Sequence, residues 1–319
     1  MNEIDPSPTN WEKKTLEKLV FDTLKEQKAR RRWGIFFKIL GFAYLFLLLA
    51  VFTGWSATDD KPEAAGSGGK ITGVVNLSGI IAADEQNSAE KINAALREAF
   101  KDKNTQGIIL RANSPGGSPV QSGIIYDEIK RLRQQYPQKK LYAVVEDLCA
   151  SGCYYVASAA DEIYVDKASL IGSIGVLMNG FGFTGAMEKL GIERRLMTAG
   201  AHKGLLDPFS PLKPEEEAYA QTLLANIHRQ FIDAVTKGRG NRLKITDDTF
   251  SGLIWTGEDG IRQGLADALG TVDSVARDVI HAEKTRDFTV KENLAERLAK
   301  QFGTEAASGF GKGLVRSLQ

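Results

Sequence analysis

A serine flanked by small residues is a candidate nucleophile in this chain. Ser151 lies in the sequence CASGCYY, where a β-rich run gives way to a helical one. A strand-to-helix turn of this kind exposes a side chain and offers the backbone N–H of the next residue, Gly152, to a tetrahedral intermediate. The Gly-x-Ser-x-Gly pattern is absent. The alternative interpretation is that small residues are needed here for close packing of helix on strand.

A second turn, Ser-Pro-Gly-Gly at 114–117, directly follows another β-rich run. Its two glycines permit backbone conformations that other residues avoid. The backbone N–H of Gly117 can therefore point at a bound anion or a developing oxyanion. Most turns of this composition serve only to reverse the chain, so this motif alone does not establish a site.

A serine nucleophile needs a base, because the hydroxyl reacts poorly at its ordinary pKa. Histidine held by a carboxylate is the usual base, and His202 is the one histidine in a suggestive place. Its neighbour Lys203 is the second candidate, since a lysine acts as a base once burial lowers its pKa from about 10.4. Residue types and spacing do not decide whether His202 or Lys203 is the base. They also leave open that Lys203 is only a solvated surface charge.

Composition excludes several classes of protein. The 319 residues carry 41 basic and 40 acidic side chains, a net charge of +1, so there is no basic excess and we expect no nucleic-acid partner. Three scattered histidines and two cysteines form no metal-binding pattern, and we expect no metal. Cys149 and Cys153 are either two small residues in a packed turn or a disulfide in an oxidising compartment.

The chain after residue 70 alternates β-rich and helical runs. Strands are expected at 71–81, 107–113, 140–147 and 162–166, and helices at 89–101, 120–136, 149–160 and 214–240. This alternation predicts an α/β sheet with helices packed against it.

An apolar run at 35–55 contains one charge, Lys38, and is bracketed by Trp33 and Trp55. At about 1.5 Å per residue it is long enough to cross a bilayer core of about 30 Å. The basic stretch at 25–32 precedes the run, which places the N-terminus in the cytoplasm and the residues that follow outside.

These observations predict a single-pass membrane protein. Its parts are a cytoplasmic amphipathic segment at 1–32 that lies on membrane lipid, a transmembrane anchor at 33–55, a flexible linker at 56–69, a catalytic domain at 70–285 and a tail at 286–319.

Five motifs in this order resemble the signal peptide peptidase A family of membrane-anchored serine–lysine peptidases. They are NSPGG at 113–117, ASGCYYVASAADEIY at 150–164, GSIGV at 172–176, GAHKG at 200–204 and WTGEDGIRQGLADALG at 255–270. The resemblance implies that Ser151 is the nucleophile, Lys203 the general base and Ser173 the serine that orients the lysine amine. It also implies that Gly117 is an oxyanion-hole donor, with Gly152 adding the second N–H.

One position departs from the family's pattern. The family often has Ser-Gly-Gly-Tyr-Tyr at the nucleophile, and here Cys153 takes the place of the second glycine. A small side chain fits this position, so we do not expect the change to inactivate the site.

The resemblance also implies a fold and an assembly. The fold is a ClpP- and crotonase-like spiral of β-strands and α-helices, and the assembly is a homo-oligomeric, octameric ring tethered to the bacterial inner (cytoplasmic) membrane. The catalytic domain is then periplasmic, and the serine and lysine of one site come from neighbouring subunits.

The implied reaction is hydrolysis of signal peptide remnants or other small apolar peptides through an acyl-enzyme, without a cofactor. Two other classes stay open. One is a crotonase-type acyl-CoA enzyme, which holds an enolate with the same kind of paired N–H groups. The other is a non-catalytic membrane scaffold that forms a ring.

Overall fold

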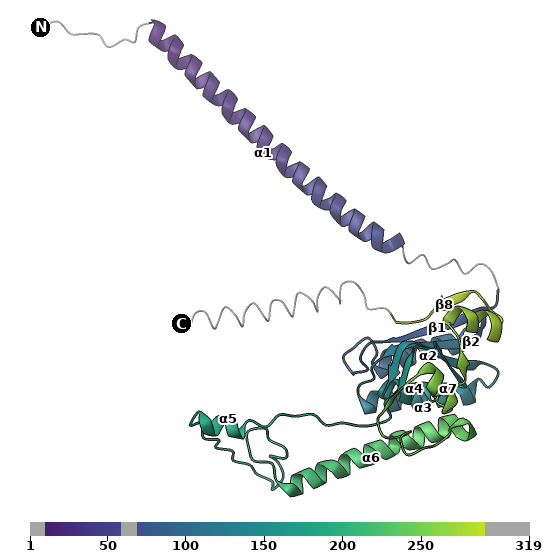
Figure 1. Ribbon diagram of the computed structural model, residues 1–319. Helices are drawn as coiled ribbons and strands as arrows, with labels where there is room; N and C mark the ends of the chain where they lie inside the picture. The colour runs from purple at the N-terminus through teal and green to yellow at the C-terminus, as the bar shows by residue number, and fades with distance from the viewer. Residues whose placement is uncertain (1–9, 59–68, 291–319) are drawn as a thin grey trace, which may run out of the picture. The chain divides into compact units, whose positions relative to one another are not determined.

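The structure is a computed structural model that describes residues 10–58 and 69–290 (Figure 1). The chain divides into two compact units, residues 1–68 and 69–319, and each is described by itself. The predicted linker at 56–69 and the predicted tail at 286–319 lie mostly outside the described residues.

A single helix, α1 (Asn10–Thr58), makes up the described part of the first unit. It joins the predicted amphipathic segment and the predicted anchor into one element, and its large apolar side chains from Leu19 to Leu47 are exposed. Within the described residues, no helix has the length and apolar character that a bilayer crossing requires. The side chains of residues 48–58, which include the last third of the predicted anchor, are not described, so the anchor stays a prediction.

The second unit is built on one eight-stranded sheet, in the order β6-β5-β3-β2-β1-β8, with β4 attached to β3 and β7 attached to β4. Neighbouring strands are parallel except β5 and β6. The predicted α/β class is confirmed. The strands are β1 (Ile71–Ser78), β2 (Thr105–Ser114), β3 (Lys140–Ala150), β4 (Glu162–Val165), β5 (Leu170–Gly172), β6 (Ile254–Thr256), β7 (Ala268–Leu269) and β8 (Thr285–Asp287).

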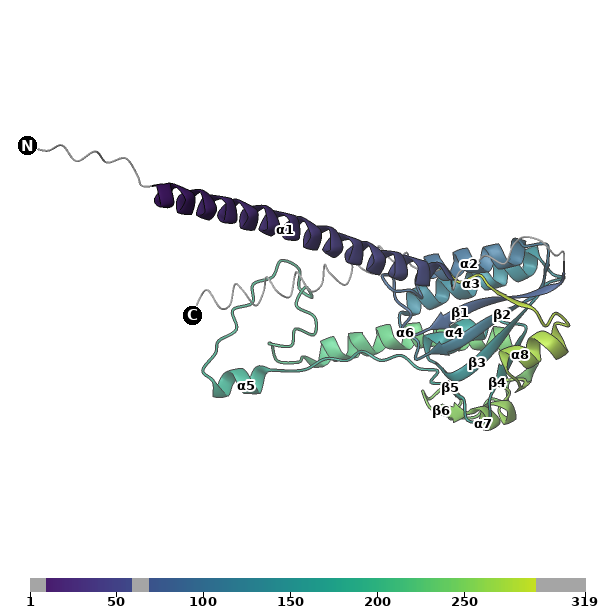
Figure 2. The same cartoon turned by 90° about the horizontal axis from the view of Figure 1, so that it is seen from above.

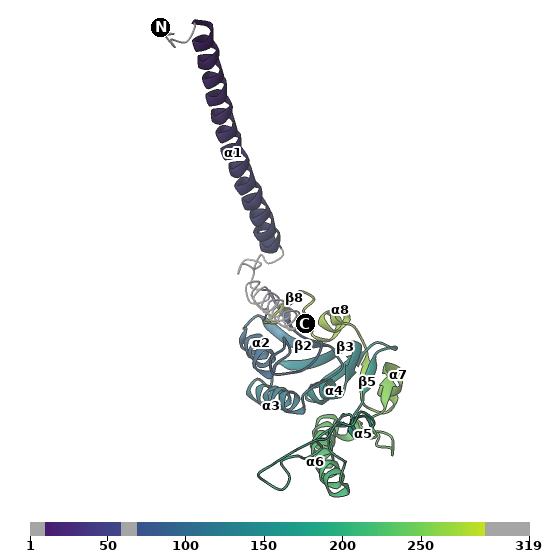
Figure 3. The same ribbon diagram turned by 90° about the vertical axis from the view of Figure 1, so that its left-hand side faces the viewer.

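Helices cover both faces of this sheet (Figure 3). Side chains alternate between the faces along each strand, so Val75 packs against α2 (Ala89–Lys101), α3 (Pro119–Gln135) and α4 (Gly152–Ala157), which share the main core. Val74 faces the other way and packs in a smaller core with Val275 and Ala276. The remaining helices are α5 (Thr184–Lys189), α6 (Pro214–Arg239), the 3-10 turn Gly240–Arg242, α7 (Gly257–Arg262), α8 (Val272–Ser274) and the π-turn Val275–Val279.

Strand β3 positions the functional turns because it changes partner along its length. Its first half pairs with β4 and its last residues pair with β5. On its other side β3 pairs with β2, where a register shift brings Ser114 opposite Cys149. The turn that follows β2 and the turn that follows β3 therefore leave the sheet as neighbours.

Residues 176–213, which we call the arm, leave the sheet after β5. Figures 1 and 2 show the arm extending away from the strands, with α5 near its far end. The arm folds on itself through a stack of Phe183 on Phe209 and a hydrogen bond from the Phe183 N–H to the Pro208 carbonyl (2.7 Å). It leaves large apolar side chains exposed, among them Leu177, Phe181 and Met197.

The predicted end of the catalytic domain at 285 falls inside β8. Residues Thr285–Asp287 pair in parallel with β1, and the Phe288 N–H donates to the Val74 carbonyl (2.8 Å). The folded domain therefore includes these residues. A three-residue strand is too short to leave a periodic pattern in the sequence.

A buried ion pair connects α6 to the body of the domain. Arg239 is fully buried and donates to both carboxylate oxygens of Asp267 (2.8 and 2.9 Å) and to the Gly264 carbonyl (2.9 Å). Burial alone would raise the pKa of Asp267, but Arg239, the Ile163 N–H and the Arg242 charge together outweigh burial and hold that pKa below its usual value. In the same turn, the Leu265 carbonyl accepts a hydrogen bond from the Tyr154 hydroxyl (2.7 Å). The helices α4 and α6 are therefore both attached to this turn.

We expect Arg239→Ala to lower the free energy of unfolding by about 3–5 kcal/mol, because it leaves the largely buried Asp267 carboxylate with only the more exposed Arg242 as a charged partner. The stabilisation from Asp267 is present above its unfolded pKa of about 3.9 and is lost as pH falls through the lower folded value. Denaturant unfolding at pH 7 and pH 3 measures both effects, and the difference between variant and wild type should shrink at pH 3.

Arg277→Ala is the matched control, since Arg277 pairs with Asp278 at an exposed site. Exposed pairs contribute about 0–1 kcal/mol. An equal loss in the two variants would contradict the role given to the buried pair.

Candidate active site

The turn at Ser151 is a strained connection between β3 and α4. Ser151 has φ 52° and ψ −123°, a region that residues other than glycine rarely adopt. Such a conformation costs about 1–3 kcal/mol and persists where the surroundings enforce it. Here the Ser151 N–H donates to the Gly172 carbonyl (2.8 Å), and its own carbonyl accepts from the Tyr155 N–H (3.0 Å). The side chain is half-buried and makes no capping hydrogen bond to α4.

The Pro-Gly-Gly turn lies directly against this serine. Gly116 has φ 94°, and a Cβ built on it would be 2.6 Å from the Gly152 nitrogen and 2.9 Å from the Ser151 Cβ. No residue with a side chain fits there. The buried Ser114 hydroxyl accepts a hydrogen bond from the Gly116 N–H (3.1 Å) and fixes the turn.

The two glycine amides predicted for the oxyanion hole are neighbours. A Cβ built on Gly152 would be 3.2 Å from the Gly117 nitrogen. Within residues 69–290, neither of these two N–H groups donates a hydrogen bond. Both are therefore free to bind a negatively charged oxygen beside Ser151, which is the arrangement that stabilises a tetrahedral intermediate.

Ser173 lies in the same cavity as Ser151. It follows β5 and also has a positive φ of 52°, with its N–H bonded to the Leu253 carbonyl (2.8 Å). Gly172 cannot carry a side chain, because its Cβ would be 2.9 Å from the Trp255 ring. The motif at 255–270 thus helps to hold the Ser173 loop in place.

The cavity has a volume of about 760 Å³, and we call it the groove. Its walls come from the two turns, from α3 and from α6. The lining residues are Pro115, Gly117, Pro119, Val120, Gly123, Ile124, Asp127, Ser151, Gly152, Tyr155, Ser173, Gly175, Val176, Leu177, Ile227, Gln230, Phe231, Ser251 and Gly252. Burial raises the pKa of Tyr155, as do the nearby Asp127 and Asp233 carboxylates, so its hydroxyl stays neutral.

Sequence reasoning did not identify the apolar walls of the groove. Ile124 and Val120 come from α3, and Phe231 and Ile227 come from α6, so residues about a hundred positions apart in the sequence form these walls. The available signal was helical amphipathicity, which indicates a buried face without indicating what that face touches. His228 on α6 also supports the site, because its Nε2 lies 3.0 Å from the Ile174 carbonyl, one residue after Ser173.

Lys203 is not among the residues that line the groove. Lys203 and His202 both lie on the arm and are exposed to solvent. A catalytic lysine needs burial to lose its charge, and the single chain gives Lys203 none. The structure therefore brings Ser151, Ser173 and the two glycine amides together and leaves both candidate bases outside.

The two cysteines that flank Ser151 form a disulfide. Of the two interpretations that the sequence left open, two small packed residues or a disulfide, the structure has the disulfide. Both Cys149 and Cys153 are fully buried.

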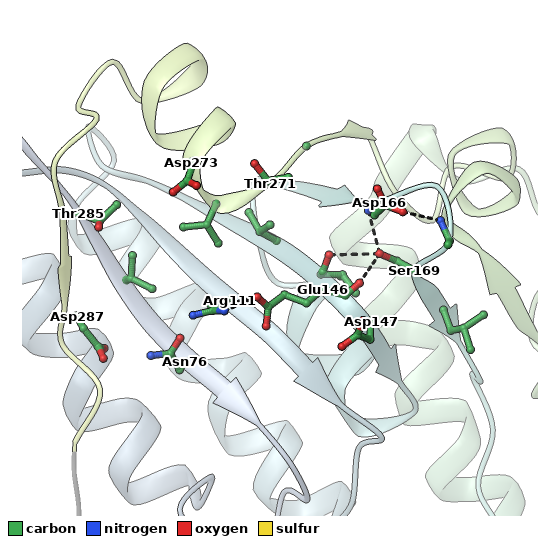
Figure 4. A pocket seen from close by; sticks show the side chains of 17 residues that line it. Asn76, Arg111, Glu146, Asp147, Asp166, Ser169, Thr271, Asp273, Thr285 and Asp287 are labelled. Carbon is green, nitrogen blue, oxygen red and sulfur yellow. Dashed lines mark hydrogen bonds and ion pairs between the residues drawn. The ribbon is translucent and has the colours of Figure 1, made fainter.

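A second cavity, of about 800 Å³, lies on the sheet face beside α8 (Figure 4). Its polar side chains are mostly engaged with each other or with the backbone: Arg111 pairs with Glu146, and the Ser169 hydroxyl donates to the Glu146 carbonyl while accepting from the Asp166 N–H (2.9 Å). None of the predicted site residues lines this cavity. The free amides and the strained serine place the candidate chemistry in the groove.

Comparison with known proteins shows that this chain is similar to peptidases. The model of peptidase family S49 matches residues 133–286, which include Ser151, Ser173 and Lys203. A protein of Methanocaldococcus jannaschii named as a protease is 32% identical over 218 residues, which cover 68% of this chain and 69% of the relative. A protein of Enterococcus faecium named as a signal peptide peptidase is 27% identical over 243 residues, covering 74% and 70% respectively.

A third relative carries a different name. The Na(+)/H(+) antiporter NhaA of Brucella abortus is 46% identical over 182 residues, which cover 57% of this chain and 25% of the antiporter. Because the chain spans only a quarter of that protein, the antiporter's name carries no argument about this chain.

Proposed function

The chain belongs to peptidase family S49, and on this premise we propose that it is a serine peptidase that cleaves peptide bonds through an acyl-enzyme on Ser151. The observation that carries the proposal is the juxtaposition of the strained Ser151 with the free N–H groups of Gly117 and Gly152 in one groove. We also propose that the α/β domain is a ClpP- and crotonase-like spiral.

In the proposed reaction, the Ser151 Oγ attacks the carbonyl carbon of the scissile bond and gives its proton to the neutral amine of Lys203. The Gly117 and Gly152 N–H groups bind the oxyanion. The protonated lysine then donates its proton to the leaving amine. Water, deprotonated by the same amine, releases the acyl group and restores the Ser151 hydroxyl. The Ser173 hydroxyl orients the amine in each step.

We propose that Lys203 reaches Ser151 from a second copy of the chain. The arm that carries Lys203 extends away from the sheet and exposes large apolar side chains, including Leu177 and Met197, which is 93% exposed. Exposed apolar surface of this kind marks contact with another protein. A homo-oligomeric ring, which we take to be octameric, would bury the arm and the lysine amine together.

We propose that α1 anchors the protein in the bacterial inner membrane. Its aromatic and aliphatic side chains between Trp33 and Leu47 are exposed, and basic residues precede them. Lipid would cover this apolar surface, and the positive-inside rule would place the catalytic domain on the periplasmic side.

The apolar walls of the groove support small, largely apolar peptide segments as substrates, including signal peptide remnants. Val120, Ile124, Leu177 and Phe231 line the groove. An extended peptide can pair its backbone with strand edges and place aliphatic side chains against such walls.

A change at Gly152 tests the proposed oxyanion hole. The Cβ of Gly152→Ala would lie 2.5 Å from the Ser122 hydroxyl and 3.2 Å from the Gly117 nitrogen, so the two amides would be pushed apart. Loss of one donor typically costs about 10²–10³ in kcat. We expect a fall of that size in steady-state hydrolysis of a chromogenic peptide, with a smaller change in KM.

The double variant Gly152→Ala/Ser122→Ala is the matched control. It removes the hydroxyl that the new methyl group meets, and it should recover part of the lost kcat. Full activity in Gly152→Ala itself would show that this amide takes no part in the reaction.

A serine-directed fluorophosphonate probe tests the function as a whole. The full chain in detergent micelles should form one covalent adduct on Ser151, located by peptide mass spectrometry. An acyl-CoA enzyme or a scaffold would give no such adduct.

A further inference from the structure

The disulfide between Cys149 and Cys153 encloses the candidate nucleophile. The bond joins the end of β3 to the first turn of α4, with Ser151 midway between the two cysteines. Their Cα atoms are 5.1 Å apart. The cross-link therefore spans the same turn whose conformation places the hydroxyl and the Gly152 N–H.

One end of this bond is fixed by the sheet. Cys149 pairs with Ser114 of β2 on one side and with Ile171 of β5 on the other. Cys153 lies on the short helix α4, whose first residue supplies the second amide of the oxyanion hole. The bond thus attaches the beginning of α4 to a part of β3 that is paired on both sides.

Ser151 needs such a restraint because its backbone is strained. A residue other than glycine at φ 52° relaxes toward negative φ unless the surroundings prevent it. Relaxation would rotate the peptide between Ser151 and Gly152 and would turn the Gly152 N–H away from the Gly117 N–H. A disulfide keeps its two Cα atoms within about 7 Å, so the turn cannot open while the bond is intact.

We propose that the Cys149–Cys153 disulfide is a positioning device for acylation of Ser151, which makes the rate of the peptidase depend on the oxidised state of these two residues. This inference rests on the proposed function. The cysteines touch neither substrate nor reacting atoms. They act through the turn between them, so their effect should fall on kcat rather than on KM.

Reduction of the bond tests the inference. A dithiothreitol thiolate attacks one cysteine sulfur, the S–S bond breaks, and the second dithiothreitol thiol displaces the remaining protein thiolate. Two protein thiols and one cyclic dithiothreitol disulfide result. Because both cysteines are buried, the full chain is treated in urea below its unfolding transition and then returned to buffer without urea. Maleimide labelling of a denatured aliquot counts the thiols by mass.

We expect the reduced wild type to hydrolyse a chromogenic peptide with kcat lower by at least about tenfold and KM changed by less than about threefold. Its second-order rate of reaction with the fluorophosphonate should fall in parallel. Reoxidation by oxidised glutathione, which takes up the two electrons, should restore both rates. A chain with two free thiols that reacts at the oxidised rate would overturn the inference.

Two variants distinguish a loss of positioning at Ser151 from a general loss of stability. Cys149→Ala/Cys153→Ala should have the low kcat of the reduced chain and should not respond to dithiothreitol. Leu132→Ala, a buried change near the end of α3 at a residue that does not line the groove, should lower Tm but keep kcat. An equal fall of kcat in Leu132→Ala would also overturn the inference. If the oxidised wild type never reacts with the probe, the proposed function fails instead.

Discussion

Replacing Ser151 by alanine is expected to abolish peptide hydrolysis and covalent labelling by a fluorophosphonate. The hydroxyl is the group that forms the acyl bond, and loss of the nucleophile in a serine peptidase typically lowers kcat by more than about 10⁴-fold. Hydrolysis of a chromogenic peptide by the full chain, with intact-mass analysis after exposure to the probe, measures both losses.

The fold should survive this substitution. The Ser151 side chain makes no capping hydrogen bond, and alanine has the same backbone preferences at a positive φ. Thermal unfolding should therefore give nearly the wild-type Tm. Ser158→Ala is the control, since this buried hydroxyl donates to the Tyr155 carbonyl (2.7 Å) and lies outside the groove. If Ser151→Ala still forms the adduct, the nucleophile has been assigned to the wrong residue.

Replacing Lys203 by alanine is expected to cause a loss nearly as large. Without a base, the Ser151 hydroxyl keeps its proton during attack, and general base catalysis contributes about 10²–10⁴-fold. His202→Ala, at the neighbouring exposed position, should retain activity within a few-fold. The reverse result, in which His202→Ala is inactive and Lys203→Ala is active, would replace the serine–lysine pair by a serine–histidine pair.

Mixing the two inactive variants tests whether the base comes from another copy. In an oligomer in which each site takes its serine from one chain and its lysine from the next, random co-assembly of Ser151→Ala with Lys203→Ala chains restores about a quarter of the sites. Co-expression of the two variants with different affinity tags, followed by purification on both tags, supplies the mixed particles. A pair from a single chain would leave the mixed particles inactive.

The sequence by itself determined the local elements of this protein. The order of β-rich and helical runs predicted the α/β class, because hydrophobic periodicity reflects which face of each element is buried. It also marked the turns at Ser151 and at Gly117, since glycines and small residues between a strand and a helix are a local signature. These features depend on neighbours along the chain, and a single sequence records them directly.

The tertiary structure decided which of these local elements are in contact. Contact of Gly116 with the Ser151 turn depends on the register of β2 on β3, and no residue of either strand specifies that register alone. The Cys149–Cys153 bond likewise depends on how a strand end meets a helix start. The spacing of residues could not predict that Lys203 lies on an exposed arm. Burial of an amine depends on groups that are far away in the sequence or in another copy of the chain.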